Sequence, residues 1–324
     1  MATPQLPIEL LEMIIENVAP RSTTLALPAS DITTRTLYSC LTVSKPTFNR
    51  GLELLYSKCL YITSQQQLHA LLRSYQSGCF ALDLKVAAST SMFLAPFTGD
   101  TIQEPKVVEN LHNLFDILGN SLRRMVIDMP LRSAYPDRRE GREIRVPLRN
   151  AFRKLMAMED FTSVRDELYL STIMPKANDI EPPGWTRWPQ LQRLALYNVD
   201  ISEDLLKNVN RLNSVKTLVL TRPDGMEDLG ALREALTPAT TIVIVNTWES
   251  HLPAQRRWIG KAMAAGQRQR ITHSEIQYSY TQDIAHVKAV CVSEIALNGG
   301  YDAQHIYQCQ DWIKAEALSG ALWC

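Results

Sequence analysis

The sequence predicts a mixed α/β (α+β) chain in three successive parts: a small helical unit over residues 1–62, a body of strands and helices over 63–250, and a mostly helical region over 251–324. Two observations predict this order. Short apolar segments with strand-like spacing recur through the middle of the chain, and segments with helical spacing separate them. At 324 residues the chain is also long enough for more than one packed unit.

The first predicted helix covers Leu6–Val18, with the sequence LPIELLEMIIENV. Pro7 is expected in its first turn, where the missing N–H would have no partner inside the helix. At 100° per residue, the apolar side chains of this segment occupy an arc of roughly 160°. A helix that lies on one core needs an apolar stripe of only about 100°. The wider arc therefore predicts either a second internal neighbour or an external partner.

Two more short helices are expected before residue 62. A polar loop rich in Ser, Thr and Pro covers 19–36. Helical spacing then returns over 37–44 and again over 47–56. Pro46 separates the two segments, because proline disfavours helical geometry at the residue before it. Three short helices are too few to close a useful core alone.

The strand-like segments of the body recur with a regular spacing. Their clearest examples follow the pattern L-x-x-L-x-L, and looser examples share its alternation. Residues 191, 215 and 241 begin successive segments about 25 residues apart, a spacing typical of leucine-rich-repeat units that must stack to bury their apolar faces. The predicted strands are 80–86, 122–127, 167–171, 191–196, 215–220 and 241–245, and the predicted helices between them are 107–119, 148–158 and 202–212.

The body over 63–250 is therefore predicted to be an irregular leucine-rich-repeat-like solenoid. The expected Asn or Cys of each repeat turn is missing, since Pro130, Val199 and Pro223 stand at those positions. An ordinary α/β domain with a parallel sheet thus remains the alternative. The C-terminal region contains two predicted helices, 283–300, which ends on two glycines, and 301–323. We expect it to cap the open end of the last repeat.

The charge balance argues against nucleic-acid binding. Lys and Arg together number 34, as do Asp and Glu, so the chain has no global positive field to attract phosphates. The basic run 256–270 is expected to be a solvated helix face. No apolar run reaches the roughly 18 residues of a membrane-spanning helix, so no membrane span is expected.

The cysteines indicate the compartment. Six are present, widely and irregularly spaced, and none forms a C-x-x-C pair. The first residues also lack the basic and apolar regions of a signal peptide. Both observations favour free thiols in a reducing compartment, the cytosol or the nucleus.

The chain carries none of the common catalytic motifs G-x-x-x-x-G-K-[ST], G-x-S-x-G, H-E-x-x-H and G-x-G-x-x-G. We therefore predict neither an enzyme nor a cofactor. Asp160, Asp166 and Glu167 could supply paired carboxylates, but a solvated turn before the next strand is the favoured interpretation.

Two His and two Cys residues near the C-terminus are the candidates for metal ligands. His305 and Cys309 are four residues apart, a spacing that places two ligands on one helix face. His286 and Cys291 lie nearby in sequence, but their five-residue spacing suits one face poorly. Cysteine is also common as a small buried side chain, so no metal is predicted.

The segment PPGWTRWPQ, residues 182–190, is a candidate recognition surface. Trp185 and Trp188 flank Arg187, and Trp and Arg dominate binding hot spots. The competing interpretation is that both tryptophans plug the edge of the core before the strand at 191.

The first 62 residues resemble the F-box, in its fungal form. LPIELLEMII matches the start of that family, and TLYSCLTVSKPTFNRGLELLYSKCLYI over 36–62 matches its second half. Phe48 stands where the family usually has Trp, and Pro46 precedes it. The match covers about 45 residues in all and is split by a variable loop.

The resemblance implies a non-catalytic substrate receptor of a Skp–cullin–F-box ubiquitin ligase. In such a receptor the N-terminal helices dock on a Skp-type adaptor, which is held by the cullin scaffold, and the repeat body captures a protein substrate. The alternative is a repeat scaffold for protein–protein interaction, with the first helices as a simple cap. The residues expected to contact the adaptor are apolar: Leu6, Pro7, Leu10, Leu11, Ile14, Ile15, Leu37, Leu41, Val43, Phe48, Leu52 and Leu55. For each of them, ordinary core packing is the competing interpretation.

Overall fold

The computed structural model describes residues 7–19, 24–77, 86–136, 139–173, 181–224, 240–247, 275–279, 287–292 and 301–323. Its helices are α1 (Ile8–Val18), α2 (Ile32–Cys40), α3 (Lys45–Lys58), α4 (Gln65–Gln76), α6 (Pro105–Leu118), α7 (Arg139–Phe152), α8 (Glu203–Asn210) and α11 (Tyr301–Ser319). Its strands are β1 (Tyr61–Ile62), β2 (Ser91–Leu94), β3 (Arg124–Ile127), β4 (Asp160–Ser163), β5 (Arg193–Tyr197), β6 (Thr217–Thr221), β7 (Thr241–Thr247), β8 (Glu275–Ser279) and β9 (Val287–Val292). Three short 3₁₀ helices are η1 (Leu131–Ser133), η2 (Gly184–Arg187) and η3 (Ala321–Trp323).

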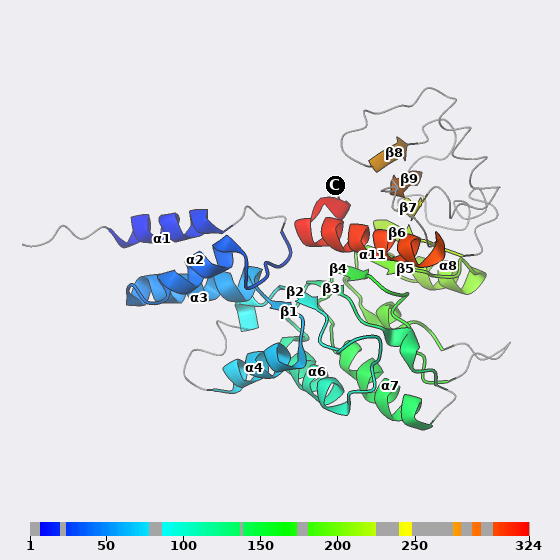
Figure 1. Ribbon diagram of the computed structural model, residues 1–324, viewed down its shortest axis with the longest axis horizontal. Coiled ribbons are helices and arrows are strands. Elements are labelled where there is room, and N and C mark those ends of the chain that lie inside the picture. Colours follow the sequence, from blue (N-terminus) through cyan, green and yellow to red (C-terminus); the bar gives the residue numbers. More distant parts are fainter. Residues whose placement is uncertain are drawn as a thin grey trace, which may run out of the picture.

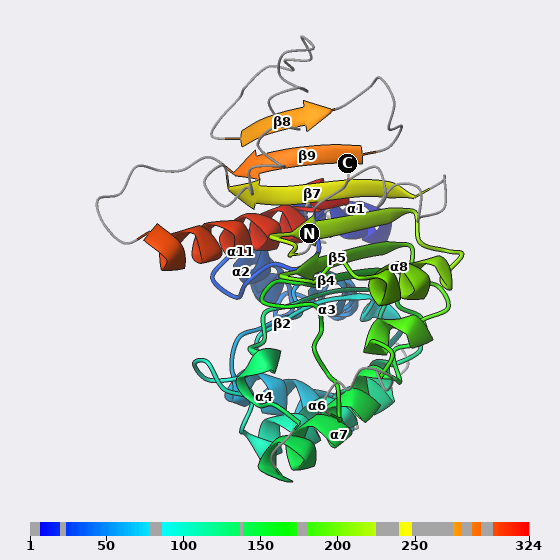
Figure 2. The same ribbon diagram turned by 90° about the vertical axis from the view of Figure 1, so that its right-hand side faces the viewer.

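The strands form one sheet in the order β1-β2-β3-β4-β5-β6-β7-β9-β8 (Figure 2). From β1 to β7, each strand pairs in parallel with the next strand of the sequence. β7 also pairs in parallel with β9, whereas β8 and β9 are antiparallel. These findings confirm the α/β class that the sequence predicts.

The strand predictions succeed where the apolar spacing is regular. β3 lies within its expected segment, and β5, β6 and β7 overlap theirs and end one or two residues later. The predicted strand over 167–171 is wrong. The strand in this region is β4, which begins seven residues earlier, at Asp160. The apolar residues of 167–171 are buried in the loop that follows β4. The predicted strand 80–86 falls almost entirely outside the described residues.

The sheet is buried on both faces, because alternate side chains of each strand point to opposite sides. In β5, Leu194 and Leu196 pack in the core that includes the apolar side chains of α4, α6, α7 and α8. Ala195 and Tyr197 pack instead in a second core with α11. Figure 1 shows α4, α6 and α7 below β1 to β4 and α11 above these four strands.

The C-terminal helix covers a face of the sheet, and not only its end. Cys309, Ile313 and Ala317 of α11 are buried against strand residues that include Phe93 in β2 and Val243 in β7. The expected helix over 283–300 is wrong over 287–292, where the structure has strand β9. The region expected to be a mostly helical cap therefore contributes two strands and a helix that crosses the sheet (Figure 2).

The N-terminal helices form a small unit beside β1, with its own core of Ile15, Leu37, Leu54 and Leu55. α2 begins earlier than expected because the Asp31 carboxylate accepts a hydrogen bond from the Thr33 N–H at 2.8 Å and caps the helix. α3 begins at Lys45 with a proline in its first turn and a capping box at Ser44. Each described helix is too short or too polar to cross a bilayer.

The burial of α11 generates a stability prediction. Replacing Ile313 with Ala should lower the free energy of unfolding by about 2–5 kcal/mol, because a fully buried side chain leaves a cavity. Tyr307→Ala on the exposed side of the same helix should change it by less than about 0.5 kcal/mol. Urea unfolding of the full chain measures both values. Equal effects of the two substitutions would contradict the packing of α11 on the sheet.

Candidate protein-docking surface and loop cavity

Helix α1 exposes most of its large apolar side chains. Only Ile15 is buried, whereas Leu10 is 44% and Ile14 is 56% exposed. Ile8 and Met13 are also exposed, so four apolar side chains face solvent within two turns. We call these four residues the α1 patch. The α1 patch exists because α2 and α3 cover only one side of a helix whose apolar arc is wide (Figure 1).

An ion pair helps fix α1 on the rest of the unit. Arg50 of α3 contacts the carboxylate of Glu16 at 2.6 Å and that of Glu53 at 2.5 Å. The pairs are partly exposed and contribute little stability. Together with buried Ile15 they define which side of α1 faces inward, so the α1 patch is held outward.

A second exposed apolar region lies at the turn between α2 and α3. Val43 is 71% exposed at this turn. Leu41 and Phe48 are half-buried and line an open hollow together with Lys45 and Asn49. The hollow presents apolar walls with a polar rim, a composition typical of protein interfaces.

The structure divides the expected adaptor-contact residues into three groups. Pro7, Leu10, Ile14 and Val43 are exposed; Leu11, Leu41, Phe48 and Leu52 are half-buried; Ile15, Leu37 and Leu55 are buried; and Leu6 lies outside the described residues. Ile15, Leu37 and Leu55 pack in the core at the centre of the helical unit, as the competing interpretation expected. A partner cannot touch them unless the unit opens.

The predicted recognition pair of tryptophans is wrong as an exposed surface. Trp185 and Trp188 are both fully buried, and only Arg187 is exposed. The Trp188 indole Nε1 donates to the carbonyl of Phe152 at 3.0 Å, and its ring packs edge to face on Phe161. Both tryptophans therefore plug the core, as the competing interpretation expected.

The acidic residues near β4 do not form paired carboxylates. Asp160 binds Arg193, and Glu167 binds Arg132 at 2.6 Å. Asp160 is buried in β4 and Asp166 is buried after it, so a solvated turn is wrong at both positions. Asp166 accepts hydrogen bonds from the N–H groups of Leu131 at 3.1 Å and Leu168 at 2.8 Å. Burial raises the pKa of Asp166 to about 7. Its carboxyl group joins the loops that follow β3 and β4.

The metal candidates are not brought together in the described part of the chain. Cys309 is buried among apolar side chains of α11 and the sheet. His286 and the side chains of Cys291 and His305 lie outside the described residues. Among the described residues, no three potential ligands of the His, Cys, Asp or Glu type gather.

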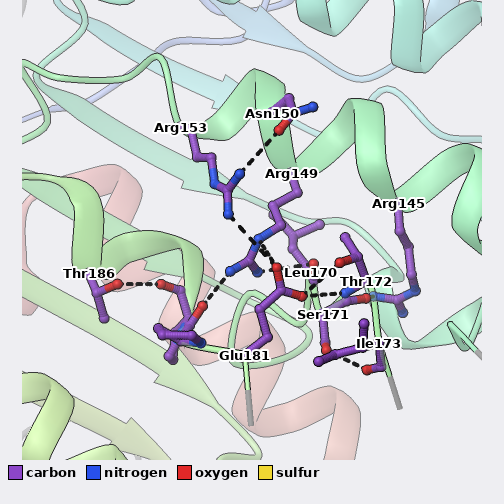
Figure 3. Close-up of polar contacts among 12 residues, drawn as sticks. Arg145, Arg149, Asn150, Arg153, Leu170, Ser171, Thr172, Ile173, Glu181 and Thr186 are labelled. Carbon is purple, nitrogen blue, oxygen red and sulfur yellow. Dashed lines mark hydrogen bonds and ion pairs between the residues drawn. The ribbon is translucent and has the colours of Figure 1, made fainter. Parts of the chain in front are cut away.

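Two buried arginines of α7 hold the loops beyond the carboxyl ends of the strands, a feature absent from the sequence predictions. Arg149 Nε contacts the Glu181 carboxylate at 2.8 Å, and its Nη1 donates to the carbonyl of Leu170 at 3.2 Å (Figure 3). Arg145 Nη1 donates to the carbonyl of Tyr169 at 2.7 Å. Burial lowers the pKa of both arginines. A sequence signal existed, because arginines four residues apart share one helix face.

These loops enclose a cavity of about 200 Å³. It is lined by residues that follow β3, β4 and β5 and by the first turns of α8. Trp185 forms part of its wall, so the segment 182–190 contributes to a concave site from within the core.

No protein-family model, no curated protein and no solved structure matches this chain.

The raised pKa of Asp166 generates a pH prediction. The unfolded chain releases this proton near pH 3.8, whereas the folded chain holds it up to about pH 7. The folded state therefore binds more protons between these values, and the free energy of unfolding should decrease as pH rises through this window. Above about pH 7 the contribution of Asp166 becomes constant.

Asp166→Asn provides the control, because asparagine does not ionise. Urea unfolding at pH 5 and pH 7.5 should show a larger loss of stability in the natural chain than in Asp166→Asn. All other titrating groups are shared and cancel in this comparison. The same change with pH in both proteins would show that Asp166 is ionised throughout.

Proposed function

We propose that this chain is a substrate receptor of a Skp–cullin–F-box type ubiquitin ligase. The N-terminal helices would dock on a Skp-type adaptor, and the body would capture a protein substrate. The observation that carries the proposal is the α1 patch: four large apolar side chains exposed on one short helix of a three-helix unit. Such a concentration of exposed apolar surface is typical of a protein-interaction site.

The arrangement of the body supports the second half of the proposal. Residues 193, 217 and 241 pair in register across β5, β6 and β7, which gives a step of about 24 residues from strand to strand. Parallel strands that pair in chain order are what an irregular leucine-rich-repeat-like body would have. A solenoid of this kind offers loops at its edges for substrate contact.

In this proposal the chain does no covalent chemistry itself. The adaptor and the cullin scaffold would hold it near a ubiquitin-loaded enzyme, and a bound substrate would gain a high effective concentration there. The cytosol or the nucleus is the expected location. Two of the described cysteines support it, since Cys40 and Cys59 are free thiols.

The exposure of each residue indicates which side chains would contact the adaptor. Leu10 and Ile14 of the α1 patch would be the central anchors, with Pro7 and Val43 also available to the adaptor. The half-buried side chains would complete the margins of the interface. The buried residues Ile15, Leu37 and Leu55 would act indirectly, by holding the three helices in place.

An adaptor pull-down tests the proposal. The double variant Leu10→Asp/Ile14→Asp should bind a purified Skp-type adaptor about 30-fold or more weakly than the natural chain, because two charges would enter an apolar interface. Both positions are exposed, so the melting curve by circular dichroism should be nearly unchanged. Adaptor capture on immobilised full-length chain gives the measurement.

Val146→Asp is the matched control, since it also places a carboxylate on an exposed apolar position, but in α7 of the body. It should bind the adaptor like the natural chain. Full adaptor binding by the double variant would contradict the assigned surface. Failure of the natural chain to bind would favour the repeat scaffold without a ligase.

A further inference from the structure

The loop cavity has a charge that its own arginines do not balance. Two arginines and four carboxylates line it. Arg132 is paired with Glu167 at 2.6 Å, and Arg149 is paired with Glu181 at 2.8 Å. Both guanidinium groups are therefore already occupied by protein carboxylates, and an anionic ligand would have to displace them.

Two carboxylates at the cavity remain available. Asp200 follows β5, and Asp204 lies in the first turn of α8. Both are exposed, and neither has an ion-pair partner among the described residues. Their negative charge favours a cation at the mouth of the cavity.

The walls of the cavity are largely apolar. Leu170, Leu196 and Leu205 line it together with Pro183 and Trp185. Such walls suit an aliphatic chain, and the acidic mouth suits a positive charge at the end of that chain. Lysine and arginine side chains combine these two properties.

The cavity is also shaped by an unusual backbone. Leu168 lines it with a φ of 60°, in the left-handed region that a bulky residue rarely adopts. This conformation is held by the hydrogen bond from the Leu168 N–H to buried Asp166. Backbone strain of this kind is concentrated at ligand sites.

A buried network keeps the loop in place (Figure 3). Glu181 accepts hydrogen bonds from the N–H of Thr172 at 2.7 Å and from its hydroxyl at 2.9 Å, while it pairs with Arg149. The cavity is therefore largely formed before any ligand arrives, which lowers the entropic cost of binding.

A residue that lines the cavity has a buried polar group without a partner in the part of the chain that the structure describes. The buried indole Nε1–H of Trp185 has no hydrogen-bond acceptor among the described residues, although buried donors are nearly always paired. A ligand that carries a hydrogen-bond acceptor close to its positive charge would offer this N–H a partner. A peptide supplies both, since every lysine or arginine residue carries a carbonyl next to its side chain.

We propose that this cavity binds a lysine or arginine side chain of the protein substrate, with Asp200 and Asp204 facing the cationic end. The inference rests on the proposed function, because that function makes the body a substrate-binding part. It names the substrate class as proteins with an exposed basic residue.

Capped tripeptides provide the test on the full-length chain. Acetyl-Ala-Lys-Ala-amide and acetyl-Ala-Arg-Ala-amide should bind about ten-fold or more tightly than the norleucine peptide, which keeps the aliphatic chain but lacks the charge. Titration calorimetry and saturation-transfer NMR measure the affinities. Binding of the basic peptides should also weaken as salt is raised, because the carboxylates are exposed.

Variants locate the site. Asp200→Asn/Asp204→Asn should weaken binding of the lysine peptide about ten-fold or more, and both positions are exposed, so the fold should be retained. Glu203→Gln is the matched control: it removes an exposed acid of the same helix that is paired with Lys207 and does not line the cavity. It should bind like the natural chain.

Three results would overturn the inference: equal binding of the norleucine peptide, unchanged binding by the double variant, or no binding of either basic peptide at about 10 mM, far above the range of specific peptide sites. The adaptor pull-down is independent of this cavity. Basic-peptide binding without adaptor binding would reject the ligase proposal alone, and adaptor binding without basic-peptide binding would reject the cavity alone.

Discussion

The burial of the parallel sheet on both faces is the constraint on which the rest of the structure depends. Each strand sends alternate side chains into two cores, as Leu194 and Ala195 do in β5. One core is closed by the connecting helices and the other by α11. Because neither face of β2 to β7 is left free, contacts with other molecules are directed to the helices beside β1 and to the loops at the strand ends.

Helix α11 also connects the two ends of the chain. Its Lys314 binds Asp128, which Arg165 binds as well. Although burial alone raises the pKa of Asp128, the hydrogen bonds and charges of these two cations lower it overall, so the carboxylate is ionised. The N–H of Leu25, just before α2, donates to the carbonyl of Leu318 at 2.8 Å. The C-terminal helix thereby fixes the helical unit relative to the sheet.

The sequence predicted the fold where apolar spacing and local structure agree. β5, β6 and β7 were predictable because each is a short apolar run and the runs recur about 24 residues apart. β4 was not, because its only large apolar residue is Phe161 and the stronger apolar pattern belongs to the buried loop over 167–171. β9 has the sequence V-K-A-V-C-V and was expected to be helical. Periodicity predicted α11 as a helix, but the face it covers depends on contacts distant in sequence.

The candidate sites, like the strands and helices, could be predicted from the sequence only in part. The wide apolar arc of α1 predicted that some side chains remain exposed, yet only the direction from which α2 and α3 pack decides that Ile15 is inside and Ile14 outside. The tryptophans of 182–190 looked like a surface because Arg187 lies between them, but the 3₁₀ turn η2 places both rings in the core. The cavity that Trp185 lines could not be predicted, because it is assembled from loops after three different strands. These loops and the α1 patch belong to different parts of the chain, so the chain has both an exposed apolar helix face and a separate cavity, the two surfaces that the proposed receptor function needs.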